Sequence, residues 1–144
     1  MFGERDKYYD ETHRFLSLLY KHFWRLHPKY DVVVFHSANF DNSTLAKLQG
    51  AVPAMPLTFA PVEIPDPARH AEEFQALRAQ GALLGTSCWP RGVPWDYLSM
   101  GRFFSKLFFA ERVLAPYDYV WRLDGNLYFD HDVTCDPFDV MVKS

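Results

Sequence analysis

The sequence has few cysteines, no long apolar run and no strong excess of charge. Only two of its 144 residues are cysteine, Cys88 and Cys135, and neither belongs to a Cys-x-x-Cys pair, so we expect no structural zinc site. Their spacing does not decide between one disulfide and two free thiols. No uninterrupted apolar run is long enough to span a bilayer. The charged N-terminus does not resemble a signal peptide, so the sequence shows no targeting signal.

The charge balance and the composition limit the classes of protein. The formal net charge is −3, with acids and bases mixed along the chain, which argues against a nucleic-acid-binding protein. Hydrophobic residues make up 49% of the chain and aromatic residues 17%, enough to form one modest domain with a core. The sequence has no Walker loop, no Gly-rich dinucleotide fingerprint and no Ser-His-Asp pattern.

Helical and strand-like segments alternate along the sequence. Apolar residues recur at helical spacing between Asp10, a candidate N-cap, and His27, and a β-branched run follows. Asp41 and the Asp136-Pro137 pair each resemble the start of a helix. The first predicted elements are a helix over 10–27, a strand around 32–34, a short helix after Asp41 that Gly50 closes, and a strand over 57–64 with Pro61 at an edge. Helices over 68–80 and 95–113, strands at 117–123 and 127–129, and a helix from Asp136 follow.

This alternation, with short connections, predicts an α/β fold with helices on the faces of a sheet. In open α/β sheets, ligands bind beyond the carboxyl ends of the strands. Asp124 directly follows the most strand-like segment that leads into an acid, with Gly125 beside it. One carboxylate there could hold Mg²⁺ or Mn²⁺ against a diphosphate, because such cations take few protein ligands. An ordinary Asp-Gly turn between two strands is the competing interpretation, and local sequence slightly favours it.

Two other interpretations of the same stretch compete with a site at Asp124. "LDGNL" resembles a phosphatase motif, but Arg122 stands where the nucleophilic Asp would be. Asp130 and Asp132 form a literal Asp-x-Asp that could chelate a cation, although a solvated acidic loop is favoured. On the 95–113 helix, Arg102 lies on an otherwise apolar surface. It could neutralise a phosphate or form a structural ion pair.

The last third of the chain contains an ordered series of residues that matches a known family. The series is Tyr97, Met100, Arg102, Phe103, Ser105 and Phe108, then Trp121 and Arg122, then Asp132, Asp136, Pro137 and Phe138. In this series the chain resembles the fungal α-1,2-mannosyltransferases (glycosyltransferase family 15). That family has a helix that reads Tyr-x-x-Met-x-Arg-Phe-x-Ser-x-x-Phe, then a strand ending Tyr-Trp-Arg-Val-Glu-Pro-Asp, then a Cys-Asp-x-x-Tyr-Asp-Pro-Phe motif.

The resemblance implies a GT-A-like (Rossmann-like) nucleotide-sugar-binding sheet, with residues 1–144 forming a single partial domain. It also implies a Golgi enzyme that uses Mn²⁺, or Mg²⁺, to hold GDP-mannose and transfers mannose to a glycan acceptor. Asp124 aligns with the family's metal-binding Glu, and Asn126 keeps an oxygen ligand where the family has Asp. Tyr97 aligns with a Tyr that lines the donor site, and Arg102 would support the donor side. Asp132 and Asp136 fall on acids with a structural role.

The family's first strand is not evident before Asp10, and neither is the part that follows its Asp-Pro-Phe helix. The sequence therefore also fits a truncated, non-catalytic module that binds a protein or glycan partner, and it assigns no catalytic residue. Asn42-Ser43-Thr44 fits the N-glycosylation sequon, a tripeptide that is common by chance.

Overall fold

The computed structural model describes residues 4–36, 41–62, 72, 75–76, 79 and 100–143. The chain divides into two compact units, Met1–Val62 with Tyr117–Ser144 (unit 1) and Glu63–Pro116 (unit 2). Within unit 1, helix α1 (Glu4–Leu19) continues into a π-helical turn, η1 (Tyr20–Trp24), and strand β1 (Val32–His36) follows. Helix α2 (Asn42–Ala51) then leads to strand β2 (Leu57–Pro61), and helix α5 (Pro137–Lys143) lies near the end of the chain.

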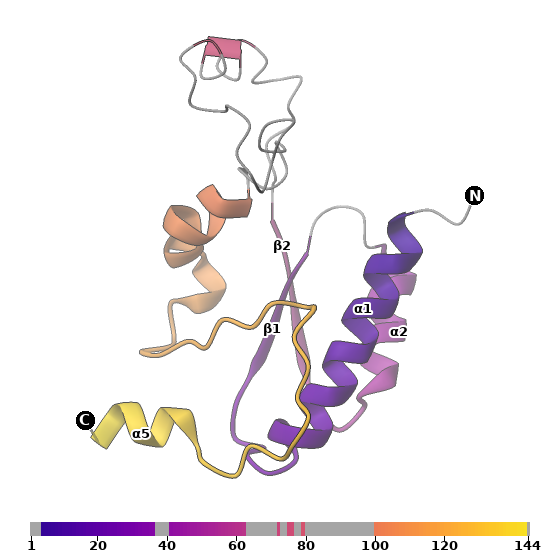
Figure 1. Cartoon of the computed structure of the whole chain (residues 1–144), viewed down its shortest axis with the longest axis vertical. Helices are drawn as coiled ribbons and strands as arrows, with labels where there is room; N and C mark the ends of the chain where they lie inside the picture. Colours follow the sequence, from indigo (N-terminus) through magenta and orange to yellow (C-terminus); the bar gives the residue numbers. More distant parts are fainter. Residues whose placement is uncertain are drawn as a thin grey trace. The chain divides into compact units, whose positions relative to one another are not determined.

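The two strands and α2 form a β-α-β unit. β1 pairs in parallel with β2, from Val32 opposite Leu57 to His36 opposite Pro61. Parallel neighbours need a crossover connection, and α2 provides it. α1 and α2 lie side by side, next to the strands (Figure 1). The described part of the chain thus contains one β-α-β repeat of the predicted α/β fold, which leaves the wider GT-A-like sheet a prediction.

The core of unit 1 forms where α1, η1 and α2 meet. Leu16 and Leu48 are almost fully buried there. Helical spacing predicted several inward side chains correctly, since Phe15 and Leu19 of α1 and Phe23 of η1 are buried. Leu26, predicted at the same spacing, is 38% exposed, because it lies beyond the end of η1. The complete cluster of buried residues is Phe15, Leu16, Leu19, Phe23, Trp24, Leu48, Val52 and Met55.

Two predicted helix boundaries are wrong. Asp10 is not an N-cap, because α1 already begins at Glu4 and Asp10 is an exposed residue inside the helix. Gly50 does not close α2, which continues to Ala51. The start of α2 is as predicted, since the Asp41 carboxylate accepts a hydrogen bond from the Thr44 amide at 2.8 Å.

The predicted strands at 117–123 and 127–129 are also wrong. Residues 117–136 follow an irregular path in unit 1 with no strand assigned to any of them. Leu123, Phe129 and Val133 nevertheless pack against the core. Strand propensity reflects how well side chains fit a pleated, half-buried surface. A strand also needs a neighbouring strand that shares its backbone hydrogen bonds. Among the described residues, β1 and β2 are the only paired strands.

The described part of unit 2 is helical but irregular. Residues 100–102 are α-helical and lead into η3 (Phe103–Leu107), η4 (Phe108–Ala110) and η5 (Arg112–Leu114). Phe103 and Phe108 are buried, with ring centroids 6.2 Å apart. The predicted 95–113 helix is therefore helical from residue 100, but it breaks at Glu111, where the backbone is extended. The predicted helix over 68–80 lies mostly outside the described residues.

Candidate functional site

Asp124 opens a tight turn in unit 1. The Leu127 amide donates a hydrogen bond to the Asp124 carbonyl at 3.0 Å, so Gly125 and Asn126 are the central residues of a β-turn. Gly125 does not adopt a left-handed conformation, and a Cβ added there would meet nothing within 4 Å. The backbone of this turn therefore does not require glycine, and the space beside Gly125 is open.

The Asp124 carboxylate is paired with Arg122. Oδ1 of Asp124 accepts hydrogen bonds from Nε and Nη2 of Arg122, at 3.1 and 2.8 Å. The Asp124 side chain is 57% exposed and that of Arg122 42% exposed, so water screens the pair and it contributes little to stability. Both contacts use Oδ1, which leaves Oδ2 on the exposed side chain as a possible cation ligand.

The structure brings together two of the four residues predicted to form a donor site. Asp124 and Asn126 share the turn, and both side chains are exposed. Tyr97 lies outside the described residues. Arg102 belongs to unit 2, where it is exposed and directly precedes η3. Among the described residues no group of three or more His, Cys, Asp or Glu side chains could hold a metal ion. A cation at Asp124 would thus need further ligands from another source than a cluster of described His, Cys, Asp or Glu side chains.

Asp132 links the irregular segment to η1. Its carboxylate accepts a hydrogen bond from Nδ1 of His22 at 2.9 Å and one from Nη2 of Arg25 at 2.6 Å. Both hydrogen bonds lower the pKa of Asp132 below its usual range, and the one from His22 has the larger effect. The Val133 amide also donates to the His22 carbonyl at 2.8 Å. Asp132 therefore has a structural role, as the family resemblance implies, while Asp130 is exposed beside it.

A second acid, Asp136, is the centre of a larger cluster. Its side chain is only 9% exposed and contacts Nζ of Lys29 at 3.0 Å. The Tyr30 hydroxyl donates to the same carboxylate at 2.7 Å, and Oδ1 accepts from the Phe138 amide at 3.0 Å as the N-cap of α5. Burial raises the pKa of Asp136, but the hydrogen bonds from Tyr30, Lys29 and the α5 amides outweigh it and lower the pKa to about 2.

Asp136 also raises the pKa of its neighbours. Its hydrogen bond holds the pKa of Lys29 above the usual lysine range. Burial, followed by the hydrogen bond to Asp136, raises the pKa of Tyr30. At neutral pH the cluster thus consists of a charged lysine, a charged carboxylate and a neutral phenol. It joins the segment after η1 to α5.

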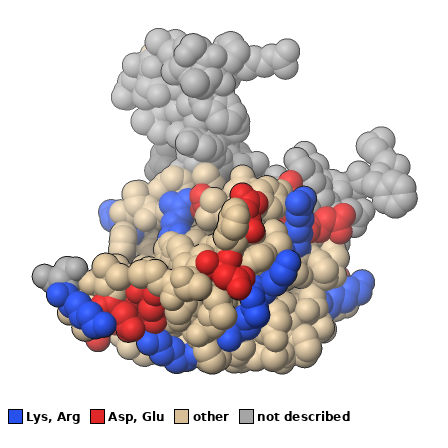
Figure 2. Space-filling model, turned by 60° about the horizontal axis from the view of Figure 1, so that its bottom comes forward, with Lys and Arg blue, Asp and Glu red and all other residues tan. Residues whose placement is uncertain are grey.

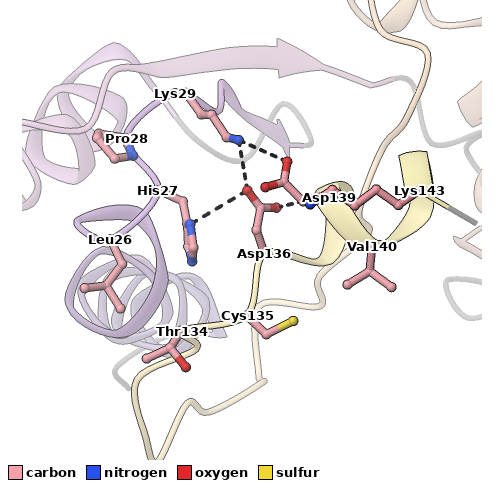
Figure 3. Close-up of a pocket in the computed structure, with 10 residues that line it drawn as sticks. All are labelled: Leu26, His27, Pro28, Lys29, Thr134, Cys135, Asp136, Asp139, Val140 and Lys143. Carbon is pink, nitrogen blue, oxygen red and sulfur yellow. Dashed lines mark hydrogen bonds and ion pairs between the residues drawn. The ribbon is translucent and has the colours of Figure 1, made fainter.

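A hollow of about 560 Å³ lies next to this cluster (Figure 3). Figure 3 shows Asp136 directed toward Lys29 and His27. The hollow carries two lysines and two aspartates, so its fixed charges balance, and the free thiol of Cys135 is exposed within it. It is lined by Leu26, His27, Pro28, Lys29, Thr134, Cys135, Asp136, Asp139, Val140 and Lys143. These acids already hold ion pairs, and the balanced charge favours no particular ligand.

Sequence reasoning predicted Asp136 as a helix cap but missed the cluster around it. Its partners Lys29 and Tyr30 lie more than a hundred residues earlier in the chain, and no local pattern connects them. The space-filling view shows the same intermixing of charge, with acidic and basic side chains beside one another on the face drawn (Figure 2).

Comparison with known proteins finds short matches to fungal mannosyltransferases. A segment of 49 residues is 42% identical to Probable mannosyltransferase KTR4 of Saccharomyces cerevisiae and covers 34% of this chain and 11% of that protein. Probable mannosyltransferase KTR5 of the same yeast is 38% identical over 49 residues, 34% of this chain and 9% of the relative. O-glycoside alpha-1,2-mannosyltransferase homolog 5 of Schizosaccharomyces pombe is 38% identical over 48 residues, 33% of this chain and 11% of the relative.

The similarity therefore covers about a third of this chain and about a tenth of the length of each relative. No family model matches the chain, and no solved structure does. Among the described residues, none of the helices has the length and apolar character that crossing a membrane requires.

Proposed function

We propose that this chain is part of a glycosyltransferase that transfers mannose from GDP-mannose to a glycan on a protein or lipid. The observation that carries the proposal is the similarity of about a third of the chain to three fungal mannosyltransferases. The ordered match from Tyr97 to Phe138 supports assignment to the fungal α-1,2-mannosyltransferase family. A Golgi-lumen location and a GT-A-like sheet come with this proposal through the resemblance.

The donor site in this proposal is centred on the turn at Asp124. Asp124 and Asn126 present a carboxylate and an amide oxygen from one exposed turn, and Mn²⁺ and Mg²⁺ prefer oxygen ligands. These two residues suit a cation that takes most of its other ligands from water and phosphate oxygens. Such a cation would neutralise the diphosphate that leaves when the sugar is transferred. Through the resemblance alone, Tyr97 and Arg102 are proposed to line or support the donor side, the arginine through its affinity for phosphate.

Arg122 has a defined role in this arrangement. Its guanidinium contacts Oδ1 of Asp124. In this proposal Oδ2 is the oxygen that would bind the cation. The positive charge of Arg122 repels a cation that binds nearby, so we expect the metal alone to bind weakly. The metal and the diphosphate should therefore bind together.

Isothermal titration calorimetry with Mn²⁺ and GDP tests the donor site. We expect GDP to bind in the presence of Mn²⁺, and Asp124→Ala to abolish the metal-dependent part of the binding. Asp130→Ala is the matched control, because Asp130 is an exposed acid in the same irregular segment, and we expect it to bind like the wild type. No GDP binding, or equal binding by the two variants, would contradict the assignment of Asp124.

A non-catalytic binding module is the second candidate, and the apolar surface of unit 1 favours it. Tyr119, Leu127, Tyr128 and Val142 are large apolar or aromatic side chains that are at least 43% exposed. A contact site for a partner would use exposed apolar side chains of this kind where they form one patch. Under this function, GDP-mannose would not be turned over with any mannoside acceptor, and light scattering would detect self-association. GDP release with an acceptor, from a monodisperse monomer, would exclude it.

A further inference from the structure

The Asn42-Ser43-Thr44 tripeptide is the only Asn-x-Ser/Thr sequence in the chain, and it lies in the first turn of α2. An N-linked glycan needs an accessible asparagine and a hydroxyl two residues later. Asn42 is exposed in the folded chain. The tripeptide therefore meets the sequence requirement and also has the exposure that a bulky modification requires.

The side chain of Asn42 is not needed to hold the start of α2. Asp41 carries the cap, because its Oδ1 accepts hydrogen bonds from the Thr44 amide at 2.8 Å and from the Ser43 hydroxyl at 3.0 Å. The Asp41 carbonyl accepts from the Leu45 amide at 3.0 Å. Two neighbouring residues could each cap a helix, and the structure gives this role to Asp41. A group attached to Nδ2 of Asn42 would leave these hydrogen bonds intact.

The outer face of α2 has room for the first sugars. Residues four apart are neighbours on a helix surface, so Asn42, Ala46 and Gly50 lie along one row. All three are exposed, and a Cβ added to Gly50 would meet nothing within 4 Å. The buried contacts of α2 are on another face, which contains the fully buried Leu48. A glycan on Asn42 would thus extend over small residues and away from the core.

We propose that Asn42 is an N-glycosylation site. The inference rests on the proposed function in one respect, namely passage through the secretory lumen. There, Nδ2 of Asn42 would form a bond to the anomeric carbon of a lipid-diphosphate-linked oligosaccharide. The bond from that carbon to the diphosphate oxygen breaks, the lipid diphosphate leaves, and the amide gives up one proton to the membrane-bound oligosaccharyltransferase. No oxidation or reduction takes place.

The experiment is expression of the full chain behind a cleavable signal peptide in a eukaryotic secretory host. We expect a slower-migrating form that peptide-N-glycosidase removes, and peptide mass spectrometry should show the conversion of Asn42 to aspartate by that enzyme. Asn42→Gln and Thr44→Ala should both lack the slower form. Ser43→Ala is the matched control, because it loses a hydrogen bond to Asp41 but keeps the sequon, and it should remain glycosylated.

A wild-type chain without glycan, in cells that glycosylate a sequon-bearing reporter in the same compartment, would overturn the proposal. So would persistence of the slower form in Asn42→Gln. Circular dichroism of Asn42→Gln, expected to match the wild type, excludes misfolding as the reason for a lost glycan. Calorimetry with Mn²⁺ and GDP on this variant keeps the outcome separate from the donor site, because GDP binding does not depend on Asn42.

Discussion

Replacing Asp136 with asparagine separates the two roles of this residue. Asn at this position keeps an oxygen that can accept the α5 amide hydrogen bonds, but it removes the negative charge opposite Lys29. The cap of α5 should therefore survive in Asp136→Asn. The charge-assisted contacts with Lys29 and with the Tyr30 hydroxyl should weaken.

The magnitude follows from the pKa of Asp136. A decrease from 3.8 to about 2 corresponds to at most about 2.4 kcal/mol of stabilisation of the charged carboxylate. The carboxylate is 9% exposed, but its partner Lys29 is 57% exposed and water screens it. We therefore expect Asp136→Asn to lower the free energy of unfolding by about 1 to 2 kcal/mol at neutral pH. Asp136→Ala, which also removes the cap, should cost about 1 kcal/mol more.

The same shift predicts the direction of the pH dependence. Because the folded chain binds the proton at Asp136 more weakly than the unfolded chain, the stabilisation is complete above the unfolded pKa of 3.8. It is lost as the pH falls through the folded pKa of about 2. Wild-type stability should therefore decrease between about pH 5 and about pH 2, and Asp136→Asn should lack this contribution.

Urea denaturation at several pH values, followed by tryptophan fluorescence, measures both effects. Amide hydrogen exchange of α5 reports local loosening, since the Phe138 ring packs on Tyr30 with centroids 4.5 Å apart. Asp139→Asn is the matched control, because Asp139 also contacts Lys29, at 3.3 Å, but its side chain is 55% exposed. It should change the free energy of unfolding by less than about 0.5 kcal/mol. The same pH profile in Asp136→Asn and the wild type would refute the reasoning.

Three further predictions follow from the core, the α2–β2 connection and Asp132. Leu16→Ala should lower the free energy of unfolding by about 2–5 kcal/mol because Leu16 is 1% exposed, whereas Val142→Ala, at a 67% exposed position, should cost less than about 0.5 kcal/mol. Gln49→Ala should cost about 1–3 kcal/mol in urea denaturation, because the Gln49 amide makes three hydrogen bonds to backbone groups between α2 and β2. His22→Phe should raise the pKa of Asp132 toward its usual range, as measured by carboxyl-carbon NMR titration.

The sequence predicted those elements of the fold that short-range signals determine. The spacing of Phe15, Leu19 and Phe23 predicted the buried face of α1 and η1, and Asp41 predicted the start of α2. The start of α1 was predicted too late because Asp10 has a cap-forming side chain. Residue type alone does not distinguish an Asp inside a helix from an Asp at its N-cap. The conformation of the backbone that precedes the Asp distinguishes them.

Contacts between distant parts of the chain could not be predicted in this way. The segment 117–123 has the composition of a strand, but a strand also needs a neighbour to pair with, which composition does not report. His22 and Asp132 are 110 residues apart, and Tyr30 and Asp136 are 106 apart. Of the candidate site, the sequence predicted a possible turn at Asp124 and Gly125, and this turn forms because its hydrogen bond joins neighbouring residues. The strand that was expected to precede Asp124 does not form, the pairing with Arg122 was not predicted, and cation binding at Asp124 stays a prediction.

Of the five aspartates in the irregular segment, Asp124, Asp132 and Asp136 differ in what they can still bind. Asp132 and Asp136 have their charge satisfied by partners from η1 and the segment after it, and their pKa values are lowered by those partners. A cation at either would have to displace contacts that hold the fold together. Among the described residues, the Asp124 carboxylate is ion-paired with Arg122, a neighbour on its own exposed loop, so a cation there would not disturb the core. This difference in structural cost favours Asp124 over Asp132 and Asp136 as the metal ligand in the proposed function.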